Sequence, residues 1–141
     1  MSISAYMSRD HKDCDEVFSK MEAVANDGDW DQATSLWQSF RHDLLQHFQR
    51  EEEELFPAFE AKSGMQGGPT SVMRLEHEQM RGLLSQIDSA VSQKDLDELL
   101  GQTETLLILM QQHNAKEEQV LYPMMDQTLG QAGEDIIQAW Q

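Results

Sequence analysis

Apolar residues recur at intervals of three and four positions through most of the chain, and no segment alternates apolar and polar residues as a strand does. This spacing places the apolar side chains on one face of a helix. Gly, Pro and Asp residues interrupt the pattern and divide the chain into four pieces. We therefore expect four helices, at about residues 8–25, 31–61, 69–91 and 95–125.

Local sequence signals mark the ends of these helices. Ser8 is a suitable N-cap for the first helix, and the stretch NDGD at 26–29 ends it. Pro69 suits the first turn of the third helix because the N–H that it lacks has no intrahelical partner there. Pro57 and Pro123 lie near the ends of the second and fourth helices, where each is expected to kink or stop the helix.

The connections between the helices are short, which favours antiparallel packing of neighbours. The sequence therefore predicts an all-α fold, an antiparallel up-down-up-down four-helix bundle of two hairpins at about 8–61 and 69–125. We expect a single domain over residues 1–141, whose tail at 130–141 adds a turn or short helix. In the fourth helix the expected buried stripe is Leu99, Thr103, Leu106, Met110, His113, Glu117 and Val120.

The chain contains an internal repeat. Residues 47–57 read HFQREEEELFP and residues 113–123 read HNAKEEQVLYP, with histidine, two glutamates, leucine, an aromatic residue and proline at matching positions 66 residues apart. The pairs DH at 10–11 and EH at 76–77 each precede the histidine of these motifs by 36 positions. Each hairpin thus contributes one histidine and one H-x3-E pair, which predicts a site with approximate twofold symmetry.

The repeated residues are expected to meet at one level of the bundle. Two residues of an antiparallel hairpin lie at the same height when their midpoint falls on the connecting turn. The midpoint of 11 and 47 is 29, and that of 77 and 113 is 95, and both lie in predicted turns. Each motif glutamate lies about 40° round and about 6 Å along the helix from its histidine. Four imidazoles and two carboxylates should therefore share one layer.

Such a layer is suited to two metal ions. Unpaired buried carboxylates are costly, so cations are the expected compensation. Two histidines for each ion, with both carboxylates bridging, leave each ion short of six ligands, so that solvent, oxide or a diatomic molecule can enter. Ferritin-like bundles differ, because they use four carboxylates with Glu-x-x-His pairs.

With these residues, the chain resembles the hemerythrin-like (HHE cation-binding) family over about residues 6–126. The resemblance rests on DH at 10–11, HFQREEEELFP, LEHEQM at 75–80 and HNAKEEQVLYP. It implies a non-haem di-iron centre, two iron ions bridged by carboxylates and oxide. The metal ligands that it implies are His11, His47, Glu51, His77, His113 and Glu117.

The ligand pattern departs from that of the oxygen-carrying hemerythrins. Their third helix has H-x3-H where this chain has His77 and Arg81, and their fourth helix has H-x4-D where this chain has H-x3-E. The set is more similar to the di-iron domain of bacterial iron–sulfur cluster repair proteins. Those proteins usually carry a cysteine-containing N-terminal domain, which this sequence lacks.

The net charge and the cysteine content exclude several classes of binding partner and metal site. With 10 basic and 26 acidic residues the net charge is −16, which argues against binding to nucleic acid or anionic membranes. Cys14 is the only cysteine, so an intrachain disulfide and a four-thiolate metal site are excluded, and a reducing cytoplasm fits. Neither a signal peptide nor a membrane-spanning segment is predicted.

Several other residues receive a plainer interpretation. His42 lies five positions before His47 and is expected to point away from the site, and Glu53 belongs to a solvated face. Glu52 and Glu118 repeat and are candidates for hydrogen bonds to ligand imidazoles, although a solvated face is the simpler reading. Tyr6, the methionines and Cys14 are expected to pack rather than to react.

The sequence favours a cytoplasmic di-iron protein that binds dioxygen or a related small molecule such as nitric oxide, in sensing, storage or stress response. One alternative is a protein that handles nitric oxide or peroxide, or donates iron to iron–sulfur cluster repair. Another is a structural or adaptor bundle with zinc or no metal. Enzymatic activity stays open, because no nucleophile or organic-cofactor motif is present.

Overall fold

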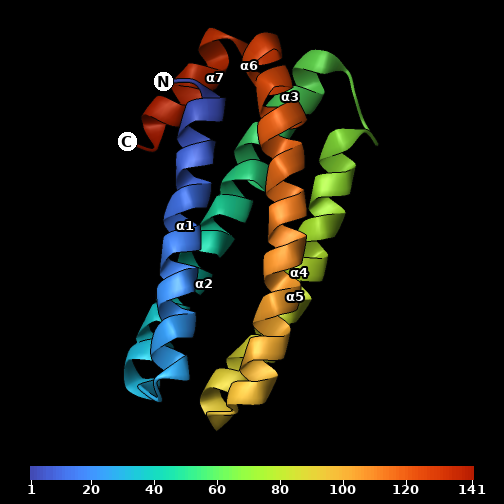
Figure 1. Cartoon of the computed structure of the whole chain (residues 1–141). Coiled ribbons are helices and arrows are strands. Elements are labelled where there is room, and N and C mark those ends of the chain that lie inside the picture. Colours follow the sequence, from blue (N-terminus) through green and yellow to red (C-terminus); the bar gives the residue numbers. More distant parts are fainter.

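The computed structural model describes residues 1–141 and contains helices joined by short turns, without a strand. Its elements are α1 (Ile3–Asn26), α2 (Trp30–Arg50), η1 (Glu51–Leu55), α3 (Phe56–Ser63), α4 (Pro69–Gln93), α5 (Leu96–Lys116), η2 (Glu117–Leu121), α6 (Tyr122–Leu129) and α7 (Gln131–Ala139). The long helices α1, α2, α4 and α5 lie side by side with alternating direction (Figure 1). The predicted all-α bundle is confirmed.

Helix α1 begins earlier than predicted. Its N-cap is Ser2, whose hydroxyl accepts a hydrogen bond from the Ala5 N–H at 3.0 Å, so the assignment of this role to Ser8 was wrong. The backbone N–H of Ile3 donates to the Asp126 carboxylate at 2.8 Å, which links this first turn to α6. Ile3 itself is fully buried, because the extra turns of α1 cover one end of the bundle.

The turns inside the two hairpins are equivalent. Asp29 caps α2 by accepting from the Gln32 N–H, and Asp95 caps α5 by accepting from the Glu98 N–H, each at 3.1 Å. The two aspartates lie 66 positions apart in the sequence, as the repeat requires. Between the hairpins, α4 opens with Pro69 in its first turn, as predicted.

Pro57 and Pro123 do not end the helices in which they lie. The α-helix widens instead into a π-helical turn, η1 or η2, immediately before Pro57 and Pro123, and then continues. The N–H of Phe56 donates to the carbonyl of Glu51, five residues back, and that of Tyr122 donates to Glu117 in the same way. The helices therefore do not stop at these prolines.

The π turns also change which residues face the core. Val120, expected in the buried stripe of the fourth helix, is 53% exposed, whereas Leu121 and Tyr122 are buried. An inserted residue moves every later side chain round the helix axis, so a stripe counted at α-helical spacing is out of phase after Glu117.

The apolar core consists of two clusters. The larger one includes Phe18, Phe40 and Leu106 and fills the half of the bundle that holds the hairpin turns. The smaller one includes Ile3, Phe59 and Met125 and lies where α1, α3, α6 and α7 meet. Along each long helix, the polar residues of the repeat lie between these two clusters.

The predicted tail forms helix α7, which packs against the start of α1. Both chain ends lie at the same end of the bundle (Figure 1). Gly133 permits this approach, because a Cβ atom there would lie 2.8 Å from Cδ1 of Ile3. No helix combines the length and apolarity needed to cross a membrane.

Candidate metal centre

Six polar side chains meet in the layer between the two apolar clusters. They are His11, His47, Glu51, His77, His113 and Glu117, and all six are buried. The Nε2 atoms of His11 and His47 lie 3.1 Å apart. Nε2 of His77 lies 3.2 Å from Glu51 Oε1, and Nε2 of His113 lies 3.2 Å from Glu117 Oε1. The structure thus brings together every residue that the midpoint argument placed on one level.

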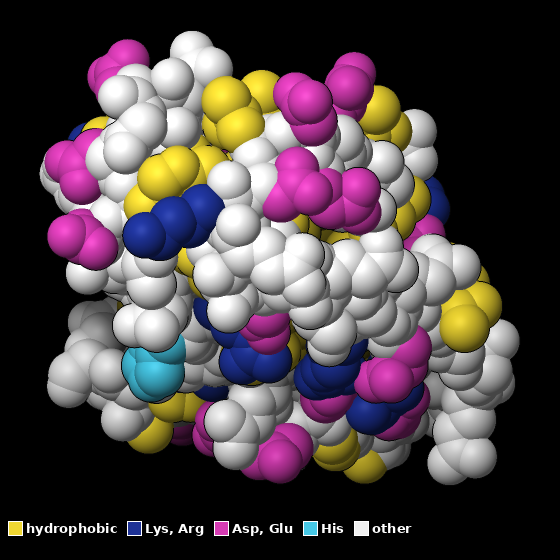
Figure 2. All heavy atoms as spheres, turned by 90° about the horizontal axis from the view of Figure 1, so that it is seen from below, with side chains coloured by type: hydrophobic (Ala, Val, Ile, Leu, Met, Phe, Trp, Pro, Cys, Tyr) yellow, Lys and Arg dark blue, Asp and Glu magenta, His cyan; other side chains and the backbone are white.

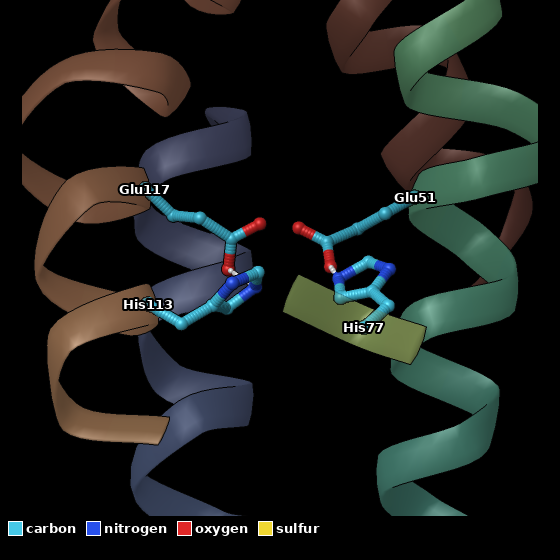
Figure 3. Close-up of side chains that lie close together, drawn as sticks. All are labelled: Glu51, His77, His113 and Glu117. Carbon is cyan, nitrogen blue, oxygen red and sulfur yellow. Dashed lines mark ion pairs between the residues drawn. The ribbon is translucent and has the colours of Figure 1, made fainter. Parts of the chain in front are cut away.

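The two carboxylates approach each other from opposite sides of the bundle. Figure 3 shows Glu51 and Glu117 pointing toward one another, each paired with an imidazole, His77 or His113. Four atoms of these residues are buried without a hydrogen-bond partner, namely Glu51 Oε1, His77 Nε2, His113 Nε2 and Glu117 Oε2. Orphaned buried donors and acceptors are rare in folded proteins, and four in one place fit a bound cation.

A carboxylate outside the layer orients each imidazole. Nδ1 of His47 lies 2.7 Å from Asp10 Oδ2, and Nδ1 of His113 lies 2.8 Å from Glu76 Oε1. These two acids are the first letters of the DH and EH pairs, so the repeat already contained this signal, although their role was not predicted.

The other two imidazoles are oriented in the same way. Nδ1 of His77 lies 2.6 Å from Glu52 Oε2, and Nδ1 of His11 lies 2.7 Å from Glu118 Oε2. Glu52 and Glu118 therefore make the contacts that were one of their two predicted roles. All four rings present Nε2 to the interior, which is the arrangement that metal-binding histidines commonly show.

Tyr122 is a site residue that the sequence analysis missed. Its hydroxyl lies 2.8 Å from Glu51 Oε2 and 2.9 Å from Glu117 Oε1. It also lies 3.2 Å from Nε2 of His11 and 3.3 Å from Nε2 of His47. The only signal in the sequence was the shared aromatic position before proline in the two motifs, where the first motif has Phe56.

Burial and mutual contact shift the pKa values of the buried acids in opposite directions. Burial, together with the nearby charge of Glu117, raises the pKa of Glu51 well above its usual range. Burial also opposes ionisation of Glu117, but hydrogen bonds from Glu51, His11 and His113 hold its pKa well below the usual range. The two carboxyl groups thus differ in their affinity for a proton, although they occupy equivalent positions in the repeat.

The histidine pKa values are also shifted. Burial lowers the pKa of His77 to about 4, and the adjacent His113 acts in the same direction. Burial opposes protonation of His47 as well, yet hydrogen bonds to Asp10 and Glu117 raise its pKa to about 9. Neutral imidazole is the form that binds metal, so His77 is ready to bind at neutral pH.

The side chains form two groups that suit metal ions. Ligand atoms of Glu51, His77, His113 and Glu117 all lie within 4.8 Å of one another, and so do those of His11, His47 and Glu117. Imidazole nitrogen with carboxylate oxygen is a donor set typical of zinc and of non-haem iron.

The comparison with protein families agrees with this chemistry. Residues 2–125 match the hemerythrin HHE cation binding domain. The chain belongs to this hemerythrin family. The match covers all four long helices and both halves of the repeat, and the domain with its buried histidine and glutamate groups makes this a metal-binding protein. Searches of curated proteins and of solved structures each give no significant match.

The remaining candidate residues of this hemerythrin domain lie away from the centre. The side chain of His42 is 76% exposed, as predicted. Figure 2, a view of the end that holds the hairpin turns, shows acidic and basic side chains interspersed with apolar ones. Tyr6 accepts a hydrogen bond from Arg50 and packs against Trp140. Cys14 is buried, and burial raises its pKa to about 12, so its thiol is unreactive.

Proposed function

We propose that this protein binds two iron ions through His11, His47, Glu51, His77, His113 and Glu117, and that the di-iron centre binds dioxygen or a related small molecule such as nitric oxide. The four buried ligand atoms that lack a hydrogen-bond partner carry this proposal, because a bound cation would satisfy all of them. The expected role is sensing, storage or stress response in the cytoplasm.

The residues present fit a pair of ions. Two imidazoles belong to each position, and Glu51 and Glu117 lie between the positions, where each carboxylate has two oxygens to share. With iron bound, such a centre supplies a redox-active Lewis acid for small ligands. The protein's own part is to orient four imidazoles through Asp10, Glu52, Glu76 and Glu118 and to surround them with apolar clusters.

Metal analysis of protein from iron-replete cells tests the proposal. We expect close to two metal ions for each chain, mostly iron, with charge-transfer absorption in the near-ultraviolet and visible range when oxidised. Zinc is the informative competitor, because sites with nitrogen and oxygen ligands bind it more tightly than ferrous iron. A content near one, or zinc alone, would contradict a di-iron centre and favour a structural role.

Glutamate variants test the assignment of the ligands. Glu51→Ala and Glu117→Ala each remove a proposed bridge, so each should lose one metal ion or the bridged spectrum. The matched controls His42→Ala and Glu53→Ala alter exposed residues and should change neither. A dependence on His42 with a dispensable His47 would overturn the assignment.

Experiments on the iron-loaded protein then distinguish binding of a small ligand from its catalytic turnover. A stable adduct with dioxygen or nitric oxide, without consumption of the gas, supports sensing or storage. Rapid, saturable consumption of nitric oxide or peroxide, or transfer of iron to an apo iron–sulfur protein, supports the alternative role in cluster repair.

A further inference from the structure

The two halves of the centre are related by the repeat, yet they are not equivalent. The first difference is at the aromatic position before proline, where one motif has Phe56 and the other has Tyr122. The Tyr122 hydroxyl contacts Nε2 of both His11 and His47, whereas the ring of Phe56 lies parallel to His77 at 5.9 Å between centroids. The hydroxyl also contacts the carboxylates of Glu51 and Glu117, which both positions share, but only the His11–His47 position has it beside its imidazole nitrogens.

The second difference is in the contacts that the imidazole Nε2 atoms make. Nε2 of His77 and Nε2 of His113 each lie 3.2 Å from a carboxylate oxygen and form no hydrogen bond with a hydroxyl or with another imidazole. Nε2 of His11 and Nε2 of His47 contact each other and Tyr122. A metal ion entering the His77–His113 position meets imidazoles whose only Nε2 neighbours are carboxylate oxygens that can bind the same ion, whereas one entering the His11–His47 position must also displace the Tyr122 hydroxyl.

The third difference is in how firmly the outer carboxylates are held. Arg81 donates to both oxygens of Glu52, at 2.9 and 3.0 Å, and Lys116 pairs with Glu76. Asp10 and Glu118, which hold the other two imidazoles, form no ion pair with lysine or arginine. In the first half of the repeat, the residue equivalent to Arg81 is Asp15, an acid rather than a base.

The fourth difference is in the packing of the imidazole rings. Phe48 stacks on His77 with 3.9 Å between centroids and 17° between planes. The repeat position of Phe48 is Asn114, so His11 lacks this stacking partner. Aromatic stacking and cation-held carboxylates both reduce the freedom that a ligand loses when it binds metal.

All four differences favour the same position. We propose that Tyr122 makes the two metal positions unequal, so that the His77–His113 position binds the first ion and the His11–His47 position binds the second only after the Tyr122 hydroxyl releases its imidazole contacts. This inference rests on the proposed two-metal function and adds the order of loading. Tyr122 is a positioning residue in it, because it acts through the ligand imidazoles.

Titration of the metal-free full chain with cobalt(II) ions alone, without oxygen, tests the order. Calorimetry and the visible absorption of bound cobalt should give two steps that differ at least tenfold in affinity. His77→Ala should remove the tighter step, whereas His11→Ala, its counterpart in the repeat, should remove the weaker one.

The role of Tyr122 is tested by exchanging the residues of the pair. Tyr122→Phe should strengthen the second step by about fivefold to tenfold, the value of about one net hydrogen bond, and change the first step less, because the hydroxyl reaches that position only through Glu51 and Glu117. Phe56→Tyr places a hydroxyl at the equivalent position and should weaken the first step. Because the two variants act mainly on different steps, a fold defect in one leaves the other informative, and circular dichroism of each metal-free variant checks the fold.

The outcomes separate the two proposals. Fewer than two cobalt ions bound by the wild-type chain would overturn both. Two steps of equal affinity, or a second step that Tyr122→Phe weakens, would overturn the loading order alone, and the latter result would identify the phenol oxygen as a metal ligand instead.

Discussion

Each histidine of the centre has two different neighbours, a carboxylate at Nδ1 and the layer of ligand atoms at Nε2. The carboxylate fixes the tautomer with the proton on Nδ1, which leaves the Nε2 lone pair free for a metal ion. The four acids Asp10, Glu52, Glu76 and Glu118 are only partly exposed or lie at the surface, so each also connects a buried ring to solvent.

Removing one of these acids should weaken metal binding without touching a ligand. We expect Asp10→Ala or Glu76→Ala to lower the affinity for cobalt(II) by about 10- to 100-fold, because the imidazole loses its hydrogen-bond acceptor and its fixed orientation. Isothermal titration calorimetry measures the change. Asp13→Ala, an exposed acid on the same helix as Asp10, is the control, and an equal loss in this variant would show that the effect comes from net charge alone.

At the residue scale, the sequence predicted the inner six side chains and missed two of the four acids that orient them. Histidines that interrupt an apolar stripe are visible in a sequence, and the hairpin midpoints place them at one height. Asp10 and Glu76 looked like ordinary surface acids, because their role depends on which neighbouring helix they face. Tyr122 was missed because its direction depends on a π turn.

The π turns η1 and η2 decide which side chains reach the centre. In a regular α-helix, Tyr122 would lie about 140° round the axis from Glu117, five residues at about 100° each. One additional residue in the turn reduces this difference to about 40°, which brings the phenol onto the ligand face. The carbonyl of Glu52, within η1, accepts a hydrogen bond from Arg74 at 3.3 Å.

Shortening one π turn should separate the proposed metal ligands from the apolar cluster that follows them along the helix. Deleting the exposed Glu53 converts η1 to α-helical spacing, and the later residues then rotate by about 100° relative to Glu51. Either Glu51 or Phe56 must leave the interior, so we expect bound metal to fall below one ion for each chain while helical circular dichroism is kept. Deleting Gln66, in the exposed loop between the hairpins, should leave metal content unchanged.

At the element scale, apolar periodicity located all four long helices, and Gly, Pro and Asp located their turns. The apolar periodicity did not indicate the π-helical turns before Pro57 and Pro123. Proline signals a break in hydrogen bonding, and a helix can meet it by stopping, by kinking or by inserting a residue. Tertiary packing of Phe56 and Tyr122 decides among these, and one sequence does not show it.

At the scale of the whole molecule, the layer of histidines and glutamates lies inside a bundle whose net charge is −16. Because the molecule as a whole is strongly acidic, a divalent cation is attracted before it reaches its ligands. The two hairpins, and with them the antiparallel topology, could be predicted from connection lengths. The packing of α7 on the first turns of α1 could not, because both segments are short and their contacts are distant in sequence.

Stripping the metal should destabilise the bundle. Binding to the folded state alone stabilises it by about 2.7 kcal/mol for each site when free metal is 100 times Kd. With two sites, we expect the melting temperature in excess iron(II) or cobalt(II) to exceed that of the metal-free protein by more than about 10 °C. Differential scanning calorimetry under exclusion of oxygen measures this difference.

Magnesium provides the control for this measurement. Mg²⁺ prefers oxygen ligands and should give little shift, because the layer offers four imidazoles. Equal melting temperatures with and without cobalt(II) would contradict a binding site in the core.

The position of the polar layer between the two apolar clusters has a consequence for cooperativity. Without metal, the layer contains buried polar atoms that lack hydrogen-bond partners. It separates the apolar cluster around Phe59 and Met125 from the apolar cluster around Phe40 and Leu106. The metal-free chain should then open as two separate folding units, each with its own amide exchange rate. Metal ions bound across the layer would join them, so that the amides of both ends exchange together, in one event.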